Sequence, residues 1–455
     1  MKIGILPLGR ETFDVTFATE KLAAMLVALD ATGHAIVGPR DLCFDGAAAD
    51  AALAEITAAS IDHLLILQVT FTDSGAAIAA ANAHAGPLSI WAVPEPRLGG
   101  RLRLNAFCGL NLASHALGLA GRDFGWAYGD EIALDDLLAG RCNAGRLEPE
   151  PRVDPAAEAG PPSPVSMKGR RIARLGAHPD GFATCAYDGD ALAELAGVTV
   201  DELPLSALFA AAQGVDATDV AALRGAAGAE MSGLEDMEPD ALDKSLRLKL
   251  ALDGLTAQGG YDAFAIRCWP ETFTEYGGAV CGPVSMLGEA RVPCACEADV
   301  YGALTQMILQ DVADAPVFLA DIVDMDVADN SGVVWHCGQA PISMQSAGKA
   351  AATIHTNRRL PLLYEFALKP GPVTLMRISQ AHGSPKMILS RGDMLDRPMA
   401  FTGTSGVIRF DRPISAVLPD LFAAGLEHHM ALAYGDHVAA LRDVARSMNL
   451  PVIAL

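Results

Sequence analysis

The chain has 455 residues, 51% of them hydrophobic, and its 55 acidic against 33 basic residues give a formal net charge of −22. This charge, without any Lys- or Arg-rich run, argues against binding to nucleic acid, whose phosphates would repel it. No apolar run reaches the roughly 18 residues that a membrane span needs, and the first residues lack the apolar core of a signal peptide. We therefore expect a cytoplasmic protein that does not enter a membrane.

The first 148 residues predict an α/β domain. KIGILPL, from position 2, has the composition of a buried strand, and TEKLAAMLVALDAT, from position 19, has helical periodicity. HAIVGP, DHLLILQVT and LSIWAV follow, separated by Ala-rich helical stretches. This alternation is typical of a doubly wound parallel sheet. Residues 149–168 combine prolines and acids without periodicity, which predicts a linker.

The remainder predicts two further domains. Residues 169–340 contain the strand-like segments RRIARLGA, YDAFAIRCW, RVPCAC and PVFLADIV, which indicate a second, Rossmann-like parallel sheet. Residues 341–455 contain short strand-like runs set off by Gly and Pro, such as FALKPGPVTLMRIS and SGVIRFDRP. They favour a small β-rich domain of barrel type.

The stretch RVPCACEADVYGAL, from position 291, concentrates thiols and carboxylates. The chain has nine cysteines without the spacing of a zinc site, so Cys294 and Cys296 are interpreted as small buried hydrophobic residues. Glu297 opens a run with helical periodicity, and Asp299 follows it. Acids at a helix start commonly serve only the helix dipole, and this plainer interpretation suits Asp299.

Glu297 also has a partner in the next strand-like segment, which contains Asp321. A helix between two parallel strands returns the chain to the same edge of the sheet, so we expect both carboxylates at that carboxyl edge. Carboxylates held close together repel one another, and a divalent cation relieves the repulsion. The pair is a candidate metal site, with the helix-dipole interpretation of Glu297 as the alternative.

A second cluster, GLEHHMALAYGDH, places His428 and His429 side by side near the end of the chain. Imidazole is a common metal ligand, although an adjacent pair is more often structural. The segments CEADVYGAL, PVFLADIVD and LEHHMALAYGD, in this order, resemble the L-fucose and L-arabinose isomerases, with features of a shorter, less characterised subgroup. Glu297 and Asp321 lie 24 positions apart, as in the fucose branch.

The resemblance implies a metal-dependent aldose–ketose isomerase that transfers a proton through an enediol. In this interpretation Glu297 and Asp321 bind the cation and move protons, and His429 completes the set of metal ligands. Nitrogen and oxygen ligands suit Mn²⁺, or another divalent cation such as Mg²⁺ or Co²⁺, better than a thiol-favoured Zn²⁺ site. The cation would stabilise the charge that develops on the enediol.

Five further residues are candidates for contact with the sugar: Arg10, Trp269, Glu271, His336 and His428. His336, in WHCGQAP, is either a further ligand, as the arabinose branch implies, or a hydrogen-bonded neighbour of the site. Trp269 and Glu271 follow a buried strand and are otherwise a core aromatic residue and a capping acid.

Arg10 is either a solvated loop residue or, as the resemblance implies, a sugar contact in the active site of a neighbouring subunit. The latter interpretation predicts a homotrimer or homohexamer with active sites near subunit interfaces.

Two other functions stay open at this point. A metal-dependent aldolase or epimerase would use the same enediolate chemistry. A non-catalytic sugar-binding protein on the same fold is the alternative from another class, because a fold does not determine a function.

Overall fold

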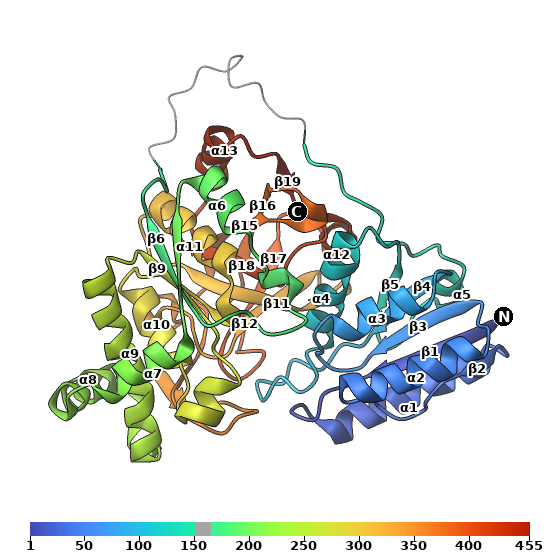
Figure 1. Cartoon of the computed structure of the whole chain (residues 1–455), viewed down its shortest axis with the longest axis horizontal. Coiled ribbons are helices and arrows are strands. Elements are labelled where there is room, and N and C mark those ends of the chain that lie inside the picture. Colours follow the sequence, from blue (N-terminus) through green and yellow to red (C-terminus); the bar gives the residue numbers. More distant parts are fainter. Residues whose placement is uncertain (151–164) are drawn as a thin grey trace.

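The computed structural model describes residues 1–150 and 165–455, and the described strands form three sheets. Most of the predicted linker, at 151–164, lies outside the described residues. Figure 1 shows the first sheet with α1–α3 at one end of the molecule, α7–α9 at the other end, and the strands of the largest sheet between them. The α/β class with two parallel sheets is confirmed, and the domain boundaries predicted from the sequence stay predictions.

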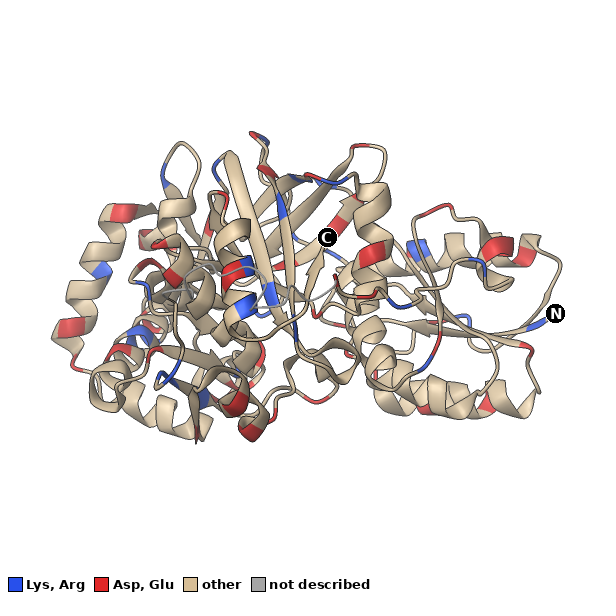
Figure 2. Cartoon of the chain, turned by 90° about the horizontal axis from the view of Figure 1, so that it is seen from above, with Lys and Arg blue, Asp and Glu red and all other residues tan. Residues whose placement is uncertain are grey.

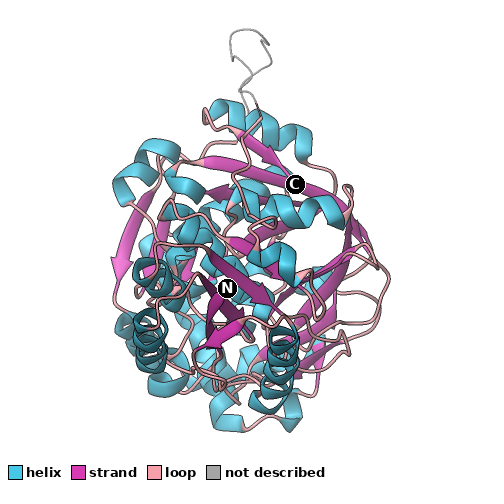
Figure 3. Ribbon diagram, turned by 90° about the vertical axis from the view of Figure 1, so that its right-hand side faces the viewer, coloured by secondary structure: helices cyan, strands magenta, loops and turns pink. Residues whose placement is uncertain are grey.

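The first sheet is five-stranded and parallel, in the order β2-β1-β3-β4-β5. The chain leaves β1 in one direction and β3 in the other, so right-handed crossovers place helices on both faces. Figure 3 views the molecule from this end, with helices on both sides of the strands. The elements are β1 (Lys2–Leu8), α1 (Val15–Ala31), β2 (Ala35–Val37), α2 (Gly46–Ala58), β3 (His63–Gln68), α3 (Gly75–Ala83), β4 (Leu88–Ala92), α4 (Ala106–Leu119), β5 (Gly125–Tyr128) and α5 (Leu134–Leu138).

The second sheet is four-stranded and parallel, in the order β10-β9-β6-β7. Its central strand β9 is AFAI, wholly buried, as expected of a strand covered on both faces. Its strands are β6 (Arg171–Leu175), β7 (Thr199–Leu203), β9 (Ala263–Ile266) and β10 (Cys294–Ala295). The helices of this region are α6 (Gly189–Ala196), α7 (Leu205–Gln213), α8 (Ala217–Glu230), α9 (Pro239–Gly259), α10 (Cys281–Glu289) and α11 (Val300–Ala313).

The third sheet is mixed and ten-stranded, in the order β19-β16-β15-β18-β11-β12-β17-β14-β13-β8, and β16 also pairs with β17. The closed C-terminal barrel stays a prediction, which this extra pairing supports. The strands are β8 (Met231–Ser232), β11 (Phe318–Asp326), β12 (Ser331–His336), β13 (Ala350–Thr353), β14 (Leu363–Ala367), β15 (Gly371–Ser379), β16 (Lys386–Met394), β17 (Thr404–Phe410), β18 (His429–Tyr434) and β19 (Val452–Ala454). Helices α12 (Ile414–Ala424) and α13 (Val438–Ser447) complete this region.

The segment 316–323 is predicted from the sequence to continue the second parallel sheet, and this prediction is wrong. It forms β11, which lies in the third sheet and pairs antiparallel with both β12 and β18. The preceding helix α11 therefore connects two different sheets. Buried strands of either sheet type have the same apolar composition, so local sequence does not distinguish them.

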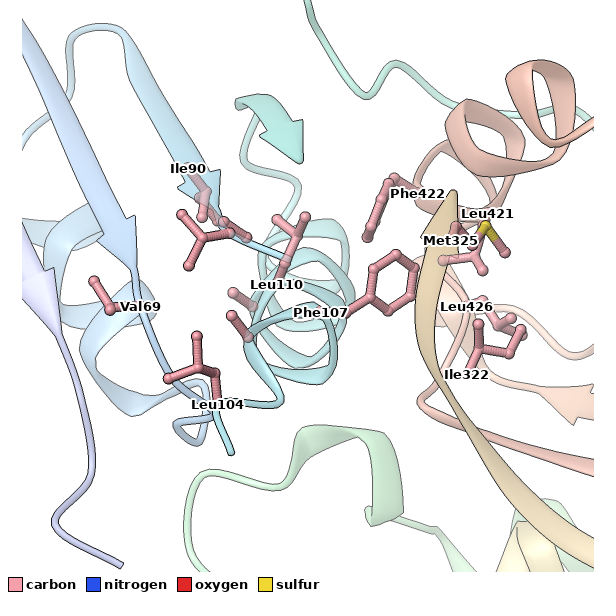
Figure 4. Close-up of a cluster of buried hydrophobic side chains, with 14 of the residues drawn as sticks. Val69, Ile90, Leu104, Phe107, Leu110, Ile322, Met325, Leu421, Phe422 and Leu426 are labelled. Atoms are coloured by element: carbon pink, nitrogen blue, oxygen red, sulfur yellow. The ribbon is translucent and has the colours of Figure 1, made fainter. Parts of the chain in front are cut away.

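Helix α4 joins the first sheet to the third. Its residues from Ala106 to Leu117 are all buried, because apolar side chains occur around its whole circumference. In Figure 4, Leu110 faces the first sheet, whereas Phe107 faces Phe422 of α12 and the strand β11. The rings of Phe107 and Phe422 lie 5.7 Å apart. One continuous core therefore fixes the first sheet against β11.

Acidic and basic residues are spread over all parts of the described chain (Figure 2). Among the described helices, none combines the length and the apolar composition that crossing a bilayer requires.

Candidate metal centre and sugar pocket

Three neighbouring strands of the third sheet bring together Asp321, His336 and His429. Asp321 lies within β11, directly opposite His429 at the start of β18. On the other side of β11, Asp321 is opposite Trp335 of β12, whose next and last residue is His336. The His336 and His429 rings lie 5.6 Å apart at an interplanar angle of 22°. The three strands thus bring one carboxylate close to two imidazoles.

Glu297 approaches these three residues from the second sheet. It lies in the turn Cys296–Ala298 between β10 and α11, with a left-handed backbone (φ 57°). Its Oε1 accepts a hydrogen bond from Trp269 Nε1 at 3.0 Å, and its Oε2 lies 2.7 Å from His428 Nε2. Burial opposes ionisation, but the contacts with His428, His429 and Trp269 outweigh it and lower the pKa of Glu297 to about 2. Glu297 is therefore a carboxylate at neutral pH.

The structure brings Glu297 and Asp321 together, although not by the predicted route. His429 Nε2 lies 3.6 Å from Glu297 Oε2 and also 3.6 Å from Asp321 Oδ1. The parallel crossover predicted to place both carboxylates on one edge is wrong, because β10 and β11 belong to different sheets. Asp321 also lies inside its strand, since β11 continues to Asp326. The carboxylates meet where the two sheets converge on His429.

Asp299 has a larger role than the predicted capping of α11. It does cap the helix, accepting from Gly302 N at 2.7 Å. Its buried carboxylate also lies 2.9 Å from His429 Nδ1 and 2.5 Å from Arg377 Nη1. Burial opposes ionisation of Asp299, but Arg377 and His429 hold its pKa well below the usual range. Sequence reasoning missed this network, because nothing local connects Asp299 with a residue 78 positions away.

The ionised Asp299 determines which nitrogen of His429 carries hydrogen. A carboxylate only accepts, so Nδ1 donates to it and Nε2 keeps its lone pair, directed toward Asp321 and Glu297. Burial and the neighbouring His428 lower the pKa of His429, which favours the neutral ring. A neutral imidazole whose other nitrogen is held by a carboxylate is the usual form of a histidine metal ligand.

The donor atoms suit a divalent cation. Asp321 Oδ1, His336 Nε2 and His429 Nε2 are buried, and none has a hydrogen-bond partner among the described residues. Potential ligand atoms of the three residues lie within 4.8 Å of one another. Neighbouring ligands of an octahedral cation with bonds of about 2.1 Å lie about 3 Å apart, so small movements suffice. Burial raises the pKa of Asp321, and a cation would relieve this cost of ionisation.

A pocket opens from this group, lined by Glu297, Asp321, His336 and His428 at one end and by Trp269 and Arg10 further out. The Arg10 guanidinium lies 5.6 Å from the Trp269 ring and pairs with Asp73 at 2.7 Å. Arg10 therefore belongs to the pocket of its own chain, and a contribution to a neighbouring subunit stays a prediction.

The remaining sequence candidates are placed as follows. Glu271 pairs with Arg267 at 2.7 Å and does not line this pocket, so its contact with a sugar stays a prediction. Cys294 and Cys296 are buried, in agreement with a packing role. Arg358, in the loop between β13 and β14, also lines the pocket and was not among the candidates. The only available signal was its position in the charged segment TNRRL.

The chain is similar to known proteins along nearly its whole length. Residues 4–138 match the family model for the N-terminal domain of fucose/sulfoquinovose isomerases, and residues 363–455 match that for the C-terminal domain of L-fucose isomerase. A sulfoquinovose isomerase of Alkalicoccus urumqiensis is 31% identical, with 99% of this chain and 98% of that protein aligned. Sulfoquinovose isomerases of Priestia megaterium and of a Clostridium species are each 29% identical over 98% of this chain and at least 97% of their own length.

Proposed function

Because the chain belongs to the L-fucose isomerase-like family, we propose that it is a sugar isomerase that interconverts an aldose and its ketose through an enediol, with a divalent cation held by Asp321, His429 and Glu297. We further propose His336 as a fourth ligand and Mn²⁺ as the cation. The proposal rests on the unpartnered Asp321, His336 and His429 atoms, which belong to a group of potential ligands within 4.8 Å of one another. Bound there, the cation would supply positive charge beside the developing enediolate.

The residues of the chain would divide the proton transfer as follows. Aldose–ketose conversion removes a proton from one carbon, delivers it to the neighbouring carbon and exchanges a proton on the adjacent oxygens. Glu297 and Asp321 both line the pocket, so one takes the carbon-bound proton while the other serves the oxygen. His428 and Trp269 hold the Glu297 carboxylate in place through its two oxygens. The pKa of about 2 keeps Glu297 ionised at neutral pH, so its oxygens carry no proton and their charge can attract a cation.

The relatives suggest the substrate more closely. We propose that the chain acts on sulfoquinovose, the 6-deoxyglucose that carries a sulfonate at carbon 6, because three relatives aligned over nearly their whole length bear that name. The metal ligands would recognise the carbonyl end of the sugar. The sulfonate would then lie toward the outer part of the pocket.

Proton NMR in D₂O tests the activity. The enzyme with Mn²⁺, incubated with sulfoquinovose, L-fucose or L-arabinose, is expected to form the partner ketose and to place deuterium at the carbon next to the carbonyl. Cleavage of the carbon chain would instead identify an aldolase, and inversion of one centre without ketose formation an epimerase. If the protein bound these sugars without exchanging any proton, it would be a binding protein, and the proposal would be refuted.

A further inference from the structure

The outer end of the pocket presents two guanidinium groups to one indole ring. Arg10 lies 5.6 Å and Arg358 lies 5.2 Å from the centre of the Trp269 ring. Arg10 follows β1 of the first sheet, whereas Arg358 belongs to the loop between β13 and β14 of the third sheet. Two distant segments thus bring a guanidinium near the same indole ring of the pocket lining.

The positive charge at this end is not fully compensated. Asp73 pairs with Arg10 at 2.7 Å, which neutralises one of the two guanidiniums. Arg358 has no ion pair or hydrogen bond with any described residue. Its guanidinium lies over the rings of Trp269 and Phe273. Arg358 is half-buried, and Glu271, which pairs with Arg267, interacts with it electrostatically without forming an ion pair.

Burial and repulsion make this arrangement costly in the free protein. Partial burial lowers the pKa of Arg358 and the positive charge of Arg10 lowers it further, although Cys268, Cys337 and Cys281 oppose this effect. Burial likewise lowers the pKa of Arg10, although Asp73 and Glu297 oppose this effect. An anion located beside both guanidiniums would relieve the repulsion and replace the lost hydration.

We propose that Arg10 and Arg358 form a subsite for the anionic group of the substrate, a sulfonate on the sugar carbon farthest from the carbons that are isomerised. This inference rests on the proposed function, and it assigns specificity to residues separate from the metal ligands. A planar guanidinium can donate two parallel hydrogen bonds to a tetrahedral oxyanion.

Trp269 relates this subsite to the reacting end of the pocket. Its Nε1 donates to Glu297 while its ring faces both guanidiniums. A hexose lying along the indole would therefore have its carbonyl end near Glu297 and its carbon 6 near the arginines. The ring face also suits the C–H groups of a sugar.

The test compares three hexoses that differ only at carbon 6: sulfoquinovose, 6-deoxyglucose and glucose 6-phosphate. For each, kcat/KM of the Mn²⁺-loaded enzyme is measured by NMR, and the dissociation constant is measured by calorimetry. The variants are Arg358→Gln, Arg358→Lys and, as a matched control, Arg359→Gln. Arg359 is exposed, lies one residue further along the same loop and does not line the pocket. Its replacement removes the same charge from the chain.

The wild type is expected to prefer sulfoquinovose to 6-deoxyglucose. Arg358→Gln should lower the ratio of their kcat/KM values by roughly 10- to 100-fold, the range for a charge-assisted hydrogen bond of about 1.5–3 kcal/mol. Arg358→Lys should restore part of the preference, and Arg359→Gln should leave it unchanged. A stronger preference for glucose 6-phosphate would support the oxyanion subsite but assign it to phosphate instead of sulfonate, which would overturn the proposal as stated.

If the ratio of kcat/KM for sulfoquinovose and 6-deoxyglucose were equal in Arg358→Gln and Arg359→Gln, the subsite would be refuted. Turnover of the sugars would still support the isomerase. If the wild type turned over none of the sugars, the isomerase assignment would fail. Calorimetry would then decide the subsite on its own. Weaker binding of sulfoquinovose to Arg358→Gln than to Arg359→Gln would support the subsite. Equal binding to the two variants, or no binding to the wild type, would overturn it.

Discussion

The two ends of the pocket are built in different ways. At the inner end, Asp321, His336 and His429 lie in or at the ends of paired strands and are 7%, 4% and 0% exposed. At the outer end, Arg10 and Arg358 lie in loops, and the Arg10 side chain is 24% exposed. Strands hold the groups that would perform the chemistry, and loops carry those that would recognise the substituent. The difference shows how one fold can keep a reaction while its substrate changes.

The largest effect is expected from neutralising the inner end. Asp321→Asn removes the charge of a buried carboxylate with little change in shape. We expect turnover of sulfoquinovose to fall roughly 10³-fold, because both cation binding and proton transfer would suffer. NMR turnover and Mn²⁺ calorimetry measure the two losses. Unchanged Mn²⁺ affinity would remove Asp321 from the proposed ligand set.

Asp299, which holds His429 at the inner end of the pocket, should matter almost as much as Asp321. Asp299→Asn keeps an acceptor for the Gly302 amide but removes the nearer charged partner of the buried Arg377 guanidinium, which then has only the Glu427 carboxylate, 3.9 Å away. We expect a loss of about 3–5 kcal/mol in the free energy of unfolding, measured with urea in the presence of a chelator. Mn²⁺ affinity should fall about 10- to 100-fold, since His429 loses the partner that orients it.

Asp30→Asn, which breaks an exposed pair with Arg40, is the control for Asp299→Asn and should leave the free energy of unfolding nearly unchanged, because solvent screens the pair. Similar losses in the two variants would show that the buried network has no special importance.

The scaffold of the outer end should respond to acid. His63 lies in β3, opposite Ile3 of the strand that leads to Arg10. Burial lowers the pKa of His63 from 6.5 to about 4, so the folded state favours the neutral ring. The unfolded chain therefore binds the proton first, and stability is lost as pH falls from about 6.5 toward 4. We expect His63→Gln to reduce this loss by on the order of 1–2 kcal/mol, measured by urea unfolding at pH 7 and pH 4.5. If the free energy of unfolding of the wild type and of His63→Gln depended on pH in the same way, His63 would not be the cause of the acid sensitivity.

The smallest effect is expected where the two ends meet. Trp269→Phe keeps an aromatic face for the sugar and the arginines but removes the hydrogen bond to Glu297 Oε1. We expect about a fivefold fall in kcat/KM, equivalent to a hydrogen bond of about 1 kcal/mol, with nearly the same sulfonate preference. A large loss of that preference would mean that the indole itself, in addition to the arginines, recognises the substituent.

Sequence reasoning was most successful where the information is local. The strands of the first sheet were predicted from short buried runs. The family resemblance correctly indicated that Glu297, Asp321 and His429 lie close together, whereas their roles stay predictions. The sheet that contains β11 could not be predicted, because pairing with β12 and β18 depends on residues far along the chain. Arg358 was missed for a related reason: a loop residue carries no periodic signal, and its importance depends on where Trp269 lies.

The register of β11 against β18 would give a bound cation a second role. Asp321 and His429 face one another only in the observed alignment, because a shift by one residue would turn one side chain to the opposite face of the sheet. A bound cation would therefore select the correctly assembled sheet over misaligned forms. Metal supply during synthesis would then influence how much of the protein matures correctly, in addition to how fast the finished enzyme works.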